Sequence, residues 1–142
     1  CLCLASMVPR GRVGSLHERY ETPTGEQLIV WRPPQQTRKP MALLVYLHGA
    51  SSRGENPAKI LELGPGTVPR LLDDGELVLD AVVISPLLNQ GSEWCKTTAQ
   101  TKRLLRQLES YFQEAVIDRS RVYCTGPSCG GELPHRSRSH AH

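Results

Sequence analysis

The sequence predicts an α/β fold with a mostly parallel sheet and flanking helices. Residues 41–47 and 81–84 are apolar at every position, which is typical of strands buried on both faces of a parallel sheet. An amphipathic segment at 104–116 lies between the second run and a third short strand pattern at 121–125. Strands that alternate with helices in this way pair in parallel, because right-handed crossovers connect them.

Turn-forming residues separate two strand patterns in the first part of the chain. Residues 18–21 and 27–31 have strand patterns, and Thr22-Pro23-Thr24-Gly25 lies between them, so we expect an antiparallel hairpin. A polar connector bounded by prolines then leads to the apolar run at 41–47. Helical patterning over residues 57–74 is weak and is interrupted by Gly64-Pro65-Gly66, which predicts one broken helix or two short ones.

The amphipathic segment has the clearest periodicity of the chain, and it predicts a helix with one apolar face. The apolar positions are Leu104, Leu105, Leu108, Tyr111, Phe112, Ala115 and Val116. The expected polar face holds Lys102, Arg103, Arg106, Gln107, Glu109, Ser110 and Gln113.

Length and charge limit the function classes. The 142 residues, 39% hydrophobic and 22% charged, suffice for one modest domain. The net charge of +3 comes from the first 40 residues, which have six basic and three acidic groups. Residues 41–142 have eleven basic and eleven acidic groups and are neutral overall. We therefore expect no nucleic-acid partner, because binding to phosphates needs a concentrated basic face. We also expect no membrane partner, because no apolar run approaches the roughly 18 to 20 residues that span a bilayer.

The first segment and the cysteines give less information. Residues 1–16 stay unassigned, because the chain opens with Cys1 and the apolar run at 2–8 has no basic segment before it. A secretory signal is thus neither affirmed nor excluded, and localisation stays open. The five cysteines are odd in number and irregularly spaced, so we expect free thiols rather than a stapled framework.

Gly126-Pro127-Ser128-Cys129-Gly130 matches G-x-S-x-G, the nucleophile elbow. In this motif a sharp strand-to-helix turn holds the serine in a strained conformation, and glycines leave room for the neighbouring chain. The motif alone is weak. Its context strengthens it, because a strand pattern precedes it and an independent His48-Gly49 loop ends another buried strand. We expect Gly49 and Gly130 to occupy positions where side chains would block the site.

Together these segments resemble the α/β-hydrolase superfamily, in the serine esterase branch similar to feruloyl esterases, polyhydroxybutyrate depolymerases and predicted peptidases. The resemblance covers roughly residues 17–131 in family order. It lies in Leu-Val-Tyr-Leu-His-Gly-Ala at 44–50 with Arg-Gly-Glu-Asn at 53–56, in Val-Val-Ile-Ser-Pro at 82–86 with Trp94 downstream, and in Asp-Arg-Ser-Arg-Val-Tyr at 118–123 leading to Thr125-Gly126 and Ser128 to Gly131.

The resemblance implies roles for particular residues. Ser128 would be the catalytic nucleophile and would attack carboxylic esters through an acyl-enzyme. The backbone N–H of Cys129 would be one oxyanion donor and that of Ala50 the second, with Ser51 as the fallback for the latter. His48 would be structural and would shape the oxyanion loop. The substrate would be a small-molecule or polymeric ester, and the resemblance implies no cofactor and no metal.

The chain departs from the family pattern after the elbow. In the family the acid and the histidine of the triad follow the nucleophile on later strands, and the serine needs that histidine to lose its proton. Only eleven residues follow Gly131, and they contain no Asp, while Glu132 and His135 stand too close to the elbow. We therefore expect residues 17–131 to be the N-terminal half of the domain, truncated after the elbow and inactive alone, and residues 132–142 to be a divergent, disordered tail.

Other interpretations stay open beside this one. The chain could be a non-catalytic interaction fragment or a pseudo-hydrolase that pairs with a partner, or with itself, through an exposed sheet edge. His48 as catalytic base and Cys129 as nucleophile are disfavoured. So is a zinc site, because Cys124 would have to leave its strand; its ligands would be Cys124, Cys129, His135 and His140.

Overall fold

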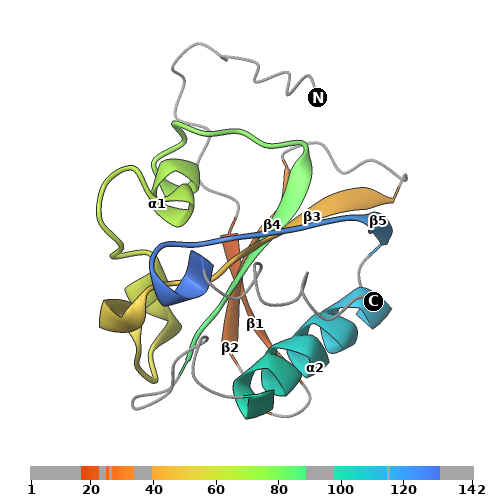
Figure 1. The fold of residues 1–142 in the computed structure, drawn as a ribbon. Coiled ribbons are helices and arrows are strands. Elements are labelled where there is room, and N and C mark those ends of the chain that lie inside the picture. Colours follow the sequence, from red (N-terminus) through yellow and green to blue (C-terminus); the bar gives the residue numbers. More distant parts are fainter. Residues whose placement is uncertain are drawn as a thin grey trace.

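The structure is a computed structural model in which a five-stranded sheet lies between helices (Figure 1). It describes residues 17–22, 25, 27–33, 40–88, 98–114 and 116–131. The segments 1–16 and 132–142, which the sequence leaves unassigned or predicts to be a divergent tail, lie outside these residues. The expected strands and helices of the domain can therefore be compared with the structure, and the two terminal segments cannot.

The sheet is mixed, and its second half is parallel. The strands are β1 (His17–Glu21), β2 (Gln27–Trp31), β3 (Met41–Tyr46), β4 (Ala81–Pro86) and β5 (Ile117–Thr125). They lie in the order β1-β2-β4-β3-β5. β1 and β2 form the expected antiparallel hairpin, β2 pairs antiparallel with β4, and β3 pairs in parallel with both β4 and β5. The prediction of an α/β fold is confirmed.

The helices are short except for the last. They are the 3-10 helices η1 (Ala50–Ser52) and η2 (Pro57–Ile60) and the α-helices α1 (Val68–Asp73) and α2 (Thr98–Glu114). Asn56 caps the start of η2, and its side chain accepts a hydrogen bond from the Ala58 N–H (3.0 Å). The Gly64-Pro65-Gly66 segment separates η2 from α1, so two short helices form rather than one broken helix.

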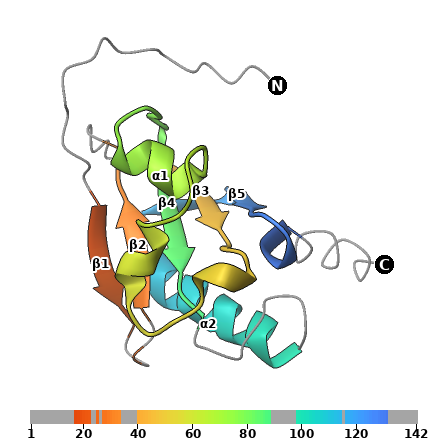
Figure 2. The same ribbon diagram turned by 90° about the vertical axis from the view of Figure 1, so that its left-hand side faces the viewer.

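Helices lie on both faces of the sheet, with α1 on one side and α2 on the other (Figure 2). Alternate residues of the strands supply an apolar core on each face. On β2, Leu28 and Val30 pack with α2, whereas Ile29 and Trp31 pack with η2 and α1. β3 and β4 are likewise apolar on both faces because helices cover both. This arrangement explains the continuous apolar runs seen in the sequence.

The face that α2 buries differs from the predicted one. Leu104, Gln107, Leu108 and Tyr111 are buried, and they follow the i, i+3, i+4, i+7 spacing of a narrow helical stripe. Gln107, predicted to be on the polar face, is 1% exposed, whereas Leu105, predicted to be in the core, is 52% exposed. The prediction failed here because one residue step turns a helix by about 100°, so Leu105 lies to one side of the stripe that contacts the sheet. No helix within the described residues is long and apolar enough to cross a membrane.

β5 forms one edge of the sheet and starts at Ile117, earlier than expected. Its pairing with β3 is irregular around Asp118, because the register shifts between Ile117 and Val122. The Asp118 carboxylate accepts hydrogen bonds from the Ser120 N–H (2.9 Å) and hydroxyl (2.6 Å) and from Arg121 Nε (2.7 Å). These bonds, those of Ser120 first, lower the pKa of Asp118 to about 2. Arg121 also donates to the Pro40 carbonyl (2.8 Å), which ties the start of β5 to the chain before β3.

Candidate active site

Two loops that the sequence singled out lie together. The 48–54 loop follows β3 and the 126–131 turn follows β5, and these strands are parallel neighbours, so both loops leave the same edge of the sheet (Figures 1 and 2). The Leu47 N–H donates to the Thr125 carbonyl (2.9 Å) where the strands end. Beyond this bond Gly49 faces Pro127: a Cβ built on Gly49 would lie 3.8 Å from Pro127 Cγ.

The 126–131 turn holds Ser128 in an unusual backbone conformation. Ser128 has a φ of 52°, the one positive value for a non-glycine among the described residues. A serine in this left-handed region costs of order 1–3 kcal/mol. A short helical turn over 129–131 follows, with hydrogen bonds from the Gly130 N–H to Pro127 O (3.0 Å) and from the Gly131 N–H to Ser128 O (2.8 Å). A strand, an exposed serine with a positive φ and a helical turn thus follow one another over residues 125–131.

Glycines are required at this turn because it packs on a carbonyl group. A Cβ on Gly126 or on Gly130 would overlap the Leu47 carbonyl oxygen, and one on Gly131 would lie 2.7 Å from Gly126 O. Gly49 differs from these glycines, because a Cβ there would make only ordinary contacts with Pro127. Its backbone is extended, with φ −74° and ψ 174°. That a side chain at Gly49 blocks the site stays a prediction.

His48 is buried and joins the loops after β3 and β4. Its Nε2 accepts a hydrogen bond from the Leu88 N–H (3.0 Å), so its Nδ1 carries the proton and donates to Gly49 O (2.8 Å). Leu88 is held a second time, because its carbonyl accepts from the Gly54 N–H (3.0 Å). Burial lowers the pKa of His48 and keeps the ring neutral. With both nitrogens bonded to backbone groups, His48 braces the 48–54 loop.

Further hydrogen bonds from backbone and side-chain donors fix the carbonyl groups of the 48–54 loop. The Gly49 carbonyl also accepts from the Ser52 N–H (3.2 Å), and the Ala50 carbonyl accepts from Arg53 Nε (2.6 Å). The Arg53 carbonyl accepts from Lys59 Nζ (3.3 Å). The direction of each of these peptide groups is therefore set by a hydrogen bond.

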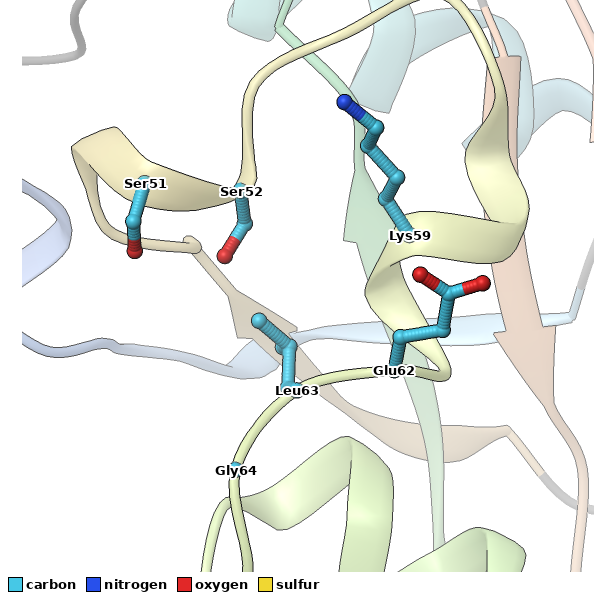
Figure 3. A pocket seen from close by; sticks show the side chains of 6 residues that line it. All are labelled: Ser51, Ser52, Lys59, Glu62, Leu63 and Gly64. Atoms are coloured by element: carbon cyan, nitrogen blue, oxygen red, sulfur yellow. The ribbon is translucent and has the colours of Figure 1, made fainter.

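A cavity of about 310 Å³ lies beside this loop. It is lined by Ser51, Ser52, Lys59, Glu62, Leu63 and Gly64. The hydroxyls of Ser51 and Ser52 point from η1 toward Leu63, and Glu62 lies across from them (Figure 3). Sequence reasoning missed this cavity, because its two walls are joined only by the path of η2, which no local pattern specifies.

The cysteines differ from the expectation of free thiols. Cys129 is disulfide-bonded, whereas Cys124 is free and exposed. The expectation failed because it used the number and spacing of cysteines, which contain no information about which of them meet in space. A thiol in a disulfide cannot be a zinc ligand, so the quartet that included Cys129 loses a member, while His135 and His140 lie outside the described residues. Within those residues no group of three or more His, Cys, Asp or Glu side chains could hold a metal ion.

The two histidines in the described part of the chain bond to groups other than Ser128. His17 Nδ1 lies 2.9 Å from Asp73 Oδ1, and this contact joins β1 to α1. The ring nitrogens of His48 bond to Gly49 and Leu88. Ser128 and Cys129 thus lie on one of two neighbouring loops and Ala50 lies on the other. Neither of the two described histidines is shown to serve as a base.

Comparison with solved structures identifies the class of fold. The chain is similar to the crystal structure of a thermostable esterase, with a TM-score of 0.57 and 18% sequence identity. The similarity covers 84% of this chain and 36% of the esterase chain. No protein-family model and no curated protein matches the sequence. The chain therefore shares its fold with part of that esterase and spans about 36% of the length of that structural relative.

Proposed function

We propose that Ser128 is the nucleophile of a serine hydrolase that acts on carboxylic esters. The observation that carries this proposal is the φ of 52° at Ser128, at the end of a parallel strand and beside the 48–54 loop. Backbone strain of this kind persists where the surrounding structure enforces it, and it gathers at functional sites. The likeness to an esterase fold supports the same reaction class.

In this mechanism the Ser128 Oγ attacks the ester carbonyl carbon, and the carbonyl oxygen becomes an oxyanion. The N–H groups of Cys129 and Ala50 would donate to that oxyanion. The proton of Ser128 passes through a base to the leaving alcohol, an acyl-enzyme remains, and water releases the acid. The cavity beside Ser51 would hold part of the small-molecule or polymeric ester. No cofactor or metal takes part in these steps.

We place the triad acid and histidine outside the described residues, since the chain spans 36% of its structural relative. These 142 residues alone should then show negligible turnover of short acyl esters, because a serine hydroxyl without its base is a poor nucleophile. The rate that remains should exceed the uncatalysed rate in water by about three to four orders of magnitude, because only the oxyanion hole and substrate binding contribute to it. Stopped-flow mixing with p-nitrophenyl acetate measures this. A burst of nitrophenol that Ser128→Ala abolishes would contradict it.

Imidazole added to the solution tests whether Ser128 is the nucleophile, because it can supply the missing base. We expect p-nitrophenyl acetate plus imidazole to acetylate Ser128, detected by peptide mass spectrometry. Ser120 on β5 is the internal control, since its side chain is exposed like that of Ser128 but its hydroxyl donates to Asp118. Acetylation of Ser128 no faster than that of Ser120 would refute the assignment.

The edge strand favours a second candidate, a non-catalytic interaction fragment or pseudo-hydrolase. Val122 and Tyr123 on β5 are 37% and 57% exposed, and β5 pairs with β3 on one side only among the described strands. An unprotected strand edge is a template for pairing with another chain. Such pairing needs no catalytic base, so both candidates predict association through this edge.

Association through β5 should depend on concentration and should be disrupted by a charge at the edge. We expect sedimentation equilibrium to show self-association of the wild-type chain and a monomer for Tyr123→Lys. Val78→Lys is the matched control, because Val78 is 46% exposed but lies outside the sheet. A wild-type monomer at all concentrations, or equal effects of the two lysines, would exclude β5 as the contact.

A further inference from the structure

We propose that Arg53 is a positioning residue of the oxyanion hole and that it presents the Ser51 N–H as a further donor. This inference rests on the proposed function and adds to it a residue that does not touch the reacting atoms. Its basis is the hydrogen bond from Arg53 Nε to Ala50 O, which at 2.6 Å is short for an N–H donor.

Peptide geometry connects this bond to the Ser51 N–H. The C=O of one residue and the N–H of the next share a plane and, in a trans peptide, point in opposite directions. No peptide bond among the described residues is cis. By holding Ala50 O, the guanidinium therefore fixes the direction of the Ser51 N–H, which points away from Arg53.

The preceding peptide group is held in the same way. His48 Nδ1 donates to Gly49 O (2.8 Å), and this bond fixes the direction of the Ala50 N–H. Two consecutive N–H groups, those of Ala50 and Ser51, are thus aimed by side chains bonded to the opposite side of their peptides. Both groups belong to the loop whose Gly49 faces Pro127, next to Ser128.

Arg53 can act as a fixed support because its own backbone is anchored. Its carbonyl accepts from Lys59 Nζ (3.3 Å), and the next residue, Gly54, donates to Leu88 O (3.0 Å). The packing of Lys59 against Gly54 is close, since a Cβ there would lie 3.0 Å from Lys59 Cδ. The guanidinium also brings a permanent positive charge to the loop, where negative charge develops in the proposed reaction.

The test compares three variants in the imidazole-dependent acetylation of Ser128. Arg53→Gln removes the charge and shortens the side chain, whereas Arg53→Lys retains a charged donor. Arg70→Gln is the matched control, because Arg70 bonds to Asp74 (2.8 Å) and Leu61 O (3.4 Å), away from the loop. We expect Arg53→Gln to lower the maximal acetylation rate about tenfold, with the ester concentration for half of that rate unchanged. Arg53→Lys should recover most of the rate, and Arg70→Gln should match wild type.

Amide NMR supplies an independent readout. The Ser51 amide should shift and exchange faster with solvent in Arg53→Gln than in Arg70→Gln, with the remaining sheet amides unchanged. An unchanged Ser51 amide, or equal acetylation rates for wild type and Arg53→Gln, would overturn the role of Arg53. If wild-type Ser128 is not acetylated at all, the proposed hydrolase function fails instead, and the two failures are thereby distinguished.

Discussion

Replacing Gly130 with alanine should destabilise the protein by about 3 kcal/mol, which is a loss of roughly 10 °C in melting temperature. The added Cβ would overlap the Leu47 carbonyl oxygen, and that carbonyl is part of the main chain, so no side-chain rotation can make room. Either the 126–131 turn must lift from the end of β3 or the strand must shift. Thermal unfolding followed by circular dichroism measures the loss.

Gly49→Ala is the control for this prediction. Its Cβ would lie 3.8 Å from Pro127 Cγ, which is an ordinary contact, and its backbone angles suit any residue. We expect its stability to stay within about 0.5 kcal/mol of wild type. Similar losses in both variants would show that the turn does not pack on Leu47 as described.

Replacing His48 with phenylalanine should destabilise the fold at every pH. In the wild-type chain, acidification should also destabilise the fold, because His48 is buried in its neutral form. His48→Phe retains a ring but leaves the buried Leu88 N–H without its acceptor, at a cost of about 1–3 kcal/mol. His48→Gln retains an acceptor for that N–H, does not titrate, and should lose less. Urea unfolding at pH 7.5 measures the free energy of unfolding, which should decrease from wild type to His48→Gln to His48→Phe.

The sign of the pH effect follows from the lowered pKa of His48. Above a pH of about 6.5 the ring is neutral in the folded and the unfolded chain, so its full contribution to stability is present. As the pH falls below that value, the unfolded chain binds a proton that the folded chain does not, and the free energy of unfolding decreases until the folded pKa is reached. The slope is at most about 1.4 kcal/mol per pH unit. The difference between wild type and His48→Gln should show this slope, and parallel curves would contradict it.

The sheet was predictable because the apolar runs and the alternation of strands with helical segments indicate the same fold. Apolar runs at 41–47 and 81–84 indicated strands covered on both faces, and helices do cover both. The position of Gln107 was not predictable, since helix periodicity specifies a stripe but does not specify which margin of it meets the sheet. The disulfide of Cys129 was missed for a related reason, because it depends on distance in space.

Part of the candidate site was also predictable. Parallel neighbouring strands end at one edge, so the loops after β3 and β5 had to meet once their strands were paired. The strained φ of Ser128 is consistent with the G-x-S-x-G pattern. The bond from Arg53 to Ala50 O and the cavity beside Ser51 depend on the path of the 48–54 loop, and that path is determined by tertiary contacts such as the one between His48 and Leu88.

The edge position of β5 has a consequence for how long the proposed site survives thermal fluctuation. Ser128 follows the outermost strand, and β3 alone among the described strands holds that strand in place. Fraying of β5 would break the bond between Leu47 and Thr125 and would carry the serine away from the 48–54 loop, while His48 and Leu88 stayed clamped. The proposed nucleophile and the proposed oxyanion donors would therefore separate at a lower free energy than the sheet needs to unfold. A second chain that pairs with β5 would therefore hold Ser128 beside the 48–54 loop and stabilise the geometry of the proposed site.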